Sequence, residues 1–94
     1  MKEVLLDFDE FMDRLDGSRS KPHAGYSRKD SDLWVSITFR ISFLESPSLV
    51  VVYEKTMTSV VYEDDKIAAF QKECRGLSEK AGATPGYYED TQAA

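Results

Sequence analysis

The chain has 94 residues, a formal net charge of −5 and one cysteine; 41% of its residues are hydrophobic and 31% are charged. This length and balance predict one folded domain spanning residues 1–94, and the acidic excess argues against general binding to phosphate backbones or anionic membranes. One cysteine excludes an internal disulfide and a cysteine-cluster zinc site, and without a signal-peptide pattern or an apolar run near 20 residues we expect a cytoplasmic protein that crosses no membrane.

The first predicted element is a helix over residues 8–15. Large apolar residues recur there every three to four positions, and acidic residues fill the opposite side. Asp7 and Glu10 have the spacing of a capping pair, which would start the helix at Phe8 and leave residues 4–6 extended. Alternatively, the apolar spacing allows the helix to begin at Val4. Gly17 is a typical end signal.

Residues 17–31 are predicted to form a long basic loop, because glycine, serine and proline interrupt every periodic pattern there. Part of it, residues 23–27, could instead form an edge strand. Cationic side chains around a tyrosine are one way to hold a nucleic-acid strand. The loop therefore supplies candidate nucleic-acid-binding residues, which are Arg19, Lys21, Tyr26, Arg28 and Lys29.

The strongest pattern in the chain is strict alternation over residues 33–44, with large apolar residues at odd positions from Leu33 to Phe43. This predicts a half-buried strand whose odd side is core. A turn follows at residues 45–48, and residues 49–62 form a second β-rich run, so the two make a long antiparallel hairpin. Pairing residues whose numbers sum to 94 places Arg40 opposite Glu54 and Thr38 opposite Thr56, which is the register we predict. Lys55 and Ser59 are misfits on its apolar side.

A second helix is predicted over residues 65–81, with an apolar stripe that contains Cys74 and with Gly82 as its end signal. A cysteine on such a stripe is expected to be buried and inert. The polar tail, residues 89–94, is expected to fray.

These elements predict a small α+β domain with the order α-β-β-α and both helices packed on one face of the hairpin. A lone hairpin leaves both strands as edges, which folded proteins cover. Three candidates for a cover are residues 23–27, residues 87–88 and the hairpin of a second subunit. The last of these predicts a homodimer.

One short stretch resembles a known motif. The residues Val4-Leu5-Leu6-Asp7-Phe8-Asp9 are similar to the first motif of haloacid-dehalogenase-type phosphatases. The resemblance implies that Asp7 is a nucleophile, that Asp9 is an acid/base and that the sheet is doubly wound. Phe11 departs from the motif, which has a small β-branched residue there. The competing interpretation is that Asp7 caps a helix and Asp9 is solvated.

No spacing of His23, Cys74 and carboxylates predicts a catalytic, cofactor or metal site. We therefore expect a non-enzymatic protein-interaction or regulatory module that is homodimeric through the hairpin. The alternatives are a nucleic-acid-associated protein that uses residues 19–29 and, third, a small enzyme with the phosphatase-like site. An acidic helix side and the polar side of the hairpin supply the candidate partner-binding residues, which are Trp34, Arg40, Tyr62, Asp9 and Asp13.

Overall fold

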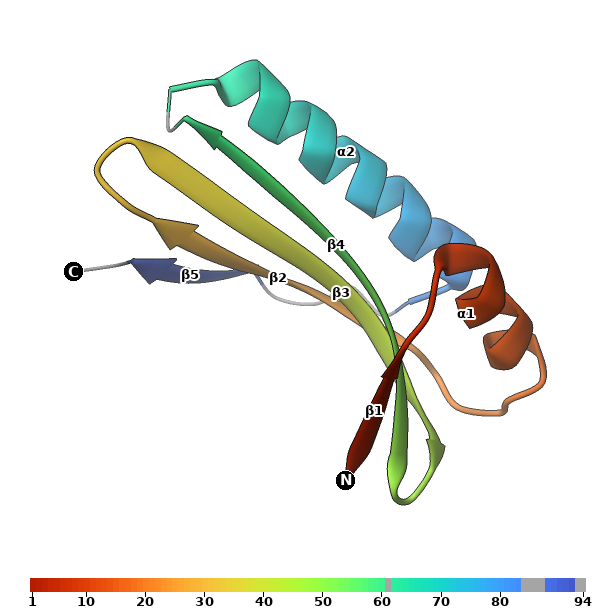
Figure 1. Ribbon diagram of the computed structural model, residues 1–94. Coiled ribbons are helices and arrows are strands. Elements are labelled where there is room, and N and C mark those ends of the chain that lie inside the picture. The colour runs from red at the N-terminus through yellow and green to blue at the C-terminus, as the bar shows by residue number, and fades with distance from the viewer. Residues whose placement is uncertain (61, 84–87, 93–94) are drawn as a thin grey trace.

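The computed structural model describes residues 1–60, 62–83 and 88–92, and it confirms the α+β class with two helices and one mixed sheet (Figure 1). The described elements, in chain order, are β1 (Lys2–Leu5), α1 (Phe8–Asp16), β2 (His23–Asp30), β3 (Trp34–Ser46), β4 (Leu49–Val60), α2 (Asp64–Ala81) and β5 (Tyr88–Gln92). The predicted order α-β-β-α is therefore incomplete, because it lacks β1, β2 and β5. These three strands are short or polar and carry no sustained apolar alternation.

The sheet has the strand order β1-β4-β3-β2-β5. Strands β2, β3 and β4 form an antiparallel meander, while β1 pairs in parallel with β4 and β5 pairs in parallel with β2. The predicted long hairpin is thus the centre of the sheet. Strand β2 pairs with β3 from Val35 to Ser42, and among the described residues β1 pairs with β4 only from Leu49 to Val52.

Helix α1 begins at Phe8, as the capping interpretation predicted, and residues Lys2–Leu5 are extended. Asp7 is the N-cap: its Oδ1 accepts a hydrogen bond from the backbone N–H of Glu10 at 2.8 Å. The chain then reaches Gly17, where the helix ends. Local capping chemistry therefore decided between the two sequence interpretations.

The predicted loop 17–31 is wrong over most of its length, because residues His23–Asp30 form β2. The option of a strand over residues 23–27 is confirmed and extended, but β5 pairs with its outer side from Tyr26 to Asp30, so β2 is not an edge strand there. Strand β2 pairs with β3 from His23 opposite Ser42 to Asp30 opposite Val35. The backbone N–H and C=O groups on the free side of β3 need hydrogen-bond partners, and residues 23–30 supply them as a strand. The side chains of these residues show no apolar alternation that would predict that strand.

The predicted hairpin register is confirmed from Trp34 opposite Val60 to Leu44 opposite Val50. Arg40 Nε lies 3.2 Å from Glu54 Oε2, and the hydroxyl oxygens of Thr38 and Thr56 are 3.4 Å apart. Past Leu44 the register shifts, so that Ser46 faces Leu49. This irregularity places one extra residue in β3 before the turn.

Leu33 is a correction to the predicted core. Its side chain is 62% exposed, and β3 begins one residue later, at Trp34. Its predicted partner, Val61, lies outside the described residues. The alternation of apolar and polar residues in the sequence continues into the bend before β3. A residue in this bend lies outside the β-ladder, so no described helix packs on its side chain.

Lys55 and Ser59, the two misfits of the register, are accommodated in different ways. The buried Ser59 hydroxyl donates to the Val60 carbonyl oxygen at 3.0 Å, and the Lys55 ammonium forms an ion pair with Glu73 on α2. Each polar group therefore has a partner on the apolar side of the sheet.

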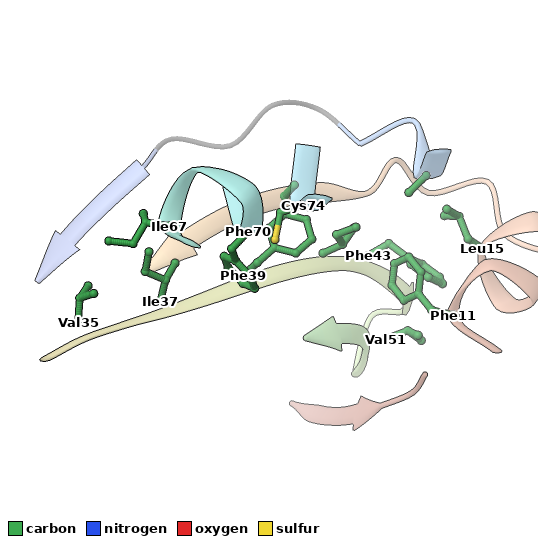
Figure 2. Close-up of a cluster of buried hydrophobic side chains, with 13 residues drawn as sticks. Phe11, Leu15, Val35, Ile37, Phe39, Phe43, Val51, Ile67, Phe70 and Cys74 are labelled. Carbon is green, nitrogen blue, oxygen red and sulfur yellow. The ribbon is translucent and has the colours of Figure 1, made fainter. Parts of the chain in front are cut away.

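Both helices pack on one face of the sheet and share one core (Figures 1 and 2). Ile67, Phe70 and Cys74 of α2 lie over the first half of β3, and Phe11 and Leu15 of α1 lie over its second half. The Phe11 and Phe43 rings meet edge to face, with centroids 5.3 Å apart. The prediction that both helices cover one face is confirmed. The buried positions of β3 are Val35, Ile37, Phe39, Ile41 and Phe43.

The end of the chain also differs from the prediction. Residues Tyr88–Gln92 form β5, paired with residues Tyr26–Asp30 of β2, so the predicted frayed tail contains a strand. The free side of β2 gives these residues a backbone partner irrespective of their polar side chains. Residues 87, 93 and 94, on which part of the prediction fell, lie outside the described residues.

Candidate functional site

One face of the sheet has no described helix over it, and we call it the open face. The side chains on this face point away from the hydrophobic core. Its members in β1 to β4 are Glu3, Leu5, His23, Gly25, Ser27, Lys29, Trp34, Ser36, Thr38, Arg40, Ser42, Leu44, Val50, Val52, Glu54, Thr56, Thr58 and Val60. Hydroxyl-bearing residues occupy its middle, and large apolar residues lie toward the two ends of the hairpin.

The apolar ends of the open face are exposed. Trp34 is 53% exposed at one end, and Leu44 and Leu5 are 48% and 61% exposed at the other. Apolar side chains gathered on a face that has no covering layer are typical of an interaction surface. The prediction that Trp34 contacts a partner therefore has a geometric basis.

Arg40 holds three strands together across the open face. Its guanidinium lies 3.1 Å from Glu3 Oε1 on β1 and 3.2 Å from Glu54 Oε2 on β4. Partial burial lowers the pKa of Arg40, but the hydrogen bonds to Glu3 and Glu54 outweigh this effect and raise the pKa above its ordinary value. Arg40 is thus already neutralised by two carboxylates from its own chain. Glu3 was missed by the sequence reasoning, since 37 residues separate it from Arg40 and no periodicity links them.

An open hollow of about 540 Å³ lies on this face beside Arg40. Gly25 sits directly opposite Arg40 on β2, and because it has no side chain it leaves space between its neighbours. The hollow is bordered by His23, Ser27, Thr38, Ser42 and Glu54. The hydroxyl groups, the His23 imidazole and the Arg40 guanidinium, which is already paired with two carboxylates, make the surface of the hollow polar. Among the described residues, no three histidine, cysteine or acidic side chains are grouped to hold a metal ion.

The outer edge of β4 is a second exposed feature. The Leu6 N–H donates to the Val52 carbonyl at 2.9 Å, and at Asp7 the chain turns into α1. From Tyr53 to Val60, β4 has no strand beside it on this side within the described residues. We call residues Glu54–Val60 along this side the β4 edge.

The predicted partner-binding residues do not form one site. Trp34 and Tyr62 lie at the same end of the hairpin, where Tyr62 is 74% exposed in the turn after β4. Asp9 and Asp13 are exposed on α1, on the other side of the sheet, and Arg40 lies in the middle of the open face. The structure therefore divides this set among three surfaces.

The candidate nucleic-acid-binding residues are also dispersed. Tyr26 packs on the helix side, with its ring centroid 5.2 Å from that of Phe39 and its hydroxyl 3.4 Å from the Gln71 carbonyl. Arg28 lies on the same side and pairs with Asp30 at 2.7 Å. Lys29 points to the open face, while Arg19 and Lys21 precede β2. This geometry does not favour one basic surface.

The phosphatase-like stretch has a different arrangement from the one that its resemblance implies. The sheet is mixed, with an antiparallel centre, and is not doubly wound. Asp7 caps α1 and Asp9 is exposed on the first turn of that helix. The capping interpretation of Asp7 is therefore confirmed.

Cys74 provides a test of the core. Its side chain is fully buried, and burial raises the pKa of the thiol from 9.0 to about 11. Because the thiolate is the reactive form, we expect Cys74 in the folded protein to react with a disulfide reagent about 100-fold more slowly, or slower still, than in concentrated urea. A time course of absorbance with such a reagent measures both rates. Equal rates would contradict the burial.

The raised pKa of Cys74 also sets a direction for stability against pH. Between about pH 9 and 11 the folded thiol keeps its proton while the unfolded thiol loses it. The unfolded state then binds fewer protons, so this contribution to the free energy of unfolding falls as pH rises through that window. Urea unfolding at several pH values should show a smaller alkaline loss in Cys74→Ala, measured against its own stability at neutral pH.

No described helix is long and apolar enough to cross a membrane. The chain matches no protein-family model, no curated protein and no solved structure.

Proposed function

We propose that the chain is a small non-enzymatic protein-interaction module that works as a homodimer assembled through the β3–β4 hairpin. The observation that supports this function most directly is that the described helices cover only one face of the sheet. The hairpin at its centre keeps an open face with exposed Trp34 and Leu44 at its ends. A protein partner fits such a surface better than a small substrate does.

The chemistry of the open face supports binding more than catalysis. Arg40 is held between Glu3 and Glu54, and the hydroxyl groups at the border of the hollow belong to Ser27, Thr38 and Ser42. The buried Cys74 thiol has a raised pKa, which disfavours a nucleophilic role. Neither arrangement supplies the nucleophile and base within hydrogen-bond reach that acyl or phosphoryl transfer uses.

The dimer is tested by the mass of the chain in solution. We expect light scattering behind size-exclusion chromatography to give twice the mass of 10.7 kDa at micromolar concentration, with a shift toward 10.7 kDa on dilution. High salt should leave the dimer in place if apolar and backbone contacts hold it. A mass of 10.7 kDa at every concentration up to the millimolar range would contradict the proposed dimer.

A further inference from the structure

We infer that a second copy of this chain pairs with the β4 edge in antiparallel orientation, with its two-fold axis at Met57. This inference rests on the proposed homodimer and names the seam through which it forms. Within the described residues, β4 has paired strands on both sides only as far as Val52, and beyond it one side is open.

The direction of the backbone groups follows from printed hydrogen bonds. The carbonyls of Ser48 and Val52, two even-numbered positions, accept from Lys2 and Leu6 on the β1 side. Backbone groups alternate along a strand, so the N–H and C=O groups of Glu54, Thr56 and Thr58 also point outward. The Val60 carbonyl already accepts from Glu63 N at 3.1 Å, whereas its N–H points to the same open side.

The β4 edge, which no described strand pairs with, is also accessible. Glu54, Thr56 and Thr58 are all exposed. Helix α2 packs on the core face, where the Tyr26 hydroxyl of β2 and the Lys55 ammonium of β4 contact it, whereas the outward backbone groups of the β4 edge point along the plane of the sheet. A strand of seven residues, roughly 20 Å long, can therefore be added beside β4 without displacing a described element.

The charges and the length of the β4 edge together select a register for a second copy. A two-fold axis at Glu54 or Lys55 would oppose like charges, which is unfavourable. An axis at Met57, the midpoint of the β4 edge, engages its whole length. It places Thr56 opposite the partner's Thr58 and Glu54 opposite the partner's Val60, so no like charges meet.

The same register satisfies the backbone. Thr56 and the partner's Thr58 can exchange two N–H···O=C bonds, because both residues present both groups outward. The Val60 N–H can also donate to the partner's Glu54 carbonyl, while the Val60 carbonyl keeps its bond from Glu63 N. Two-fold pairing uses one surface twice and closes the assembly. The two sheets then become one continuous sheet that keeps its helices on one side and its open face on the other.

Hydrogen exchange tests the seam without any substitution. In a monomer, the amides of Glu54, Thr56, Thr58 and Val60 should exchange rapidly, while those of Lys55, Met57 and Ser59 are protected by the β3 ladder. We expect the even-numbered amides to become at least about tenfold more protected at concentrations where light scattering shows a dimer. A dimer in which they stay unprotected would overturn the seam and leave the proposed homodimer standing.

Paired variants test the register and separate the edge from the open face. T56K/T58K places introduced lysines opposite each other twice across the seam, and we expect the dimer dissociation constant to rise at least about tenfold. The control S36K/T38K adds the same charge to the directly opposed positions of β3, one strand inside the edge, and should change the constant less than about threefold. Equal weakening by both variants would assign the interface to the open face and overturn the seam. A wild-type chain that is monomeric throughout would overturn the seam and the proposed homodimer together.

Discussion

Replacing Phe11 by alanine is expected to remove about 3–5 kcal/mol from the free energy of unfolding. Phe11 is completely buried, and it joins α1 to the second half of β3 through its edge-to-face contact with Phe43. The substitution leaves a cavity where the two meet, so the lost transfer energy and the lost packing add. Since small domains have about 5–15 kcal/mol in total, much of the stability depends on this contact.

Urea denaturation followed by circular dichroism measures this loss. The matched control is Leu33→Ala, another large apolar residue that alternation assigns to the core but that is 62% exposed. It should change the free energy of unfolding by less than about 0.5 kcal/mol. Similar losses for both variants would contradict the placement of α1 on the sheet.

The second large effect contrasts proline at two neighbouring positions of β4. Met57→Pro should cost about 3 kcal/mol or more, because its N–H belongs to the ladder with β3 and the ring cannot donate. Thr56→Pro should cost about 1 kcal/mol, because its N–H points to the open side, where proline is tolerated. The directions follow from Ser31 N, which donates to the Trp34 carbonyl at 2.8 Å: even positions of β3 face β2, so odd positions face β4.

Thermal and urea unfolding of dilute protein measure this contrast free of dimer dissociation. Met57→Ala supplies the cost of losing the side chain alone, which is subtracted from that of Met57→Pro. If Thr56→Pro were the more damaging of the two proline variants, the β4 edge would be turned toward β3, and the proposed seam would lose its donors and acceptors.

In the β3–β4 hairpin, the pattern of side chains was sufficient to predict both the core positions and the strand register. Alternation over β3 predicted the core positions from Val35 to Phe43, and the pairs Arg40–Glu54 and Thr38–Thr56 predicted the register. These features succeed because they depend on contacts between adjacent strands that a turn of a few residues joins. The Asp7 cap and the apolar stripes of both helices are local in the same way.

The candidate surfaces were predicted less completely. Trp34 was correctly placed on the polar side of the hairpin, but Glu3, which pairs with Arg40, was not foreseen. The sequence reasoning also did not predict that Arg19, Arg28 and Lys29 are dispersed. Arg28 and Lys29 are neighbours in the part of strand β2 that was not predicted, and neighbouring side chains of a strand point to opposite faces of the sheet. The residues of a shared surface can therefore be identified only after the strand that carries them has been identified.

The two helices, the central hairpin and its register follow from the amino-acid sequence alone, because they depend on the spacing of side chains and on local caps. The existence of β1, β2 and β5 depends on tertiary contacts, and so does the β4 edge, which no strand covers beyond Val52 among the described residues. Backbone N–H and C=O groups are the same in nearly every residue, so an unpaired strand recruits whichever segment the chain brings beside it. The side-chain pattern of a segment therefore does not show whether it pairs with such a strand.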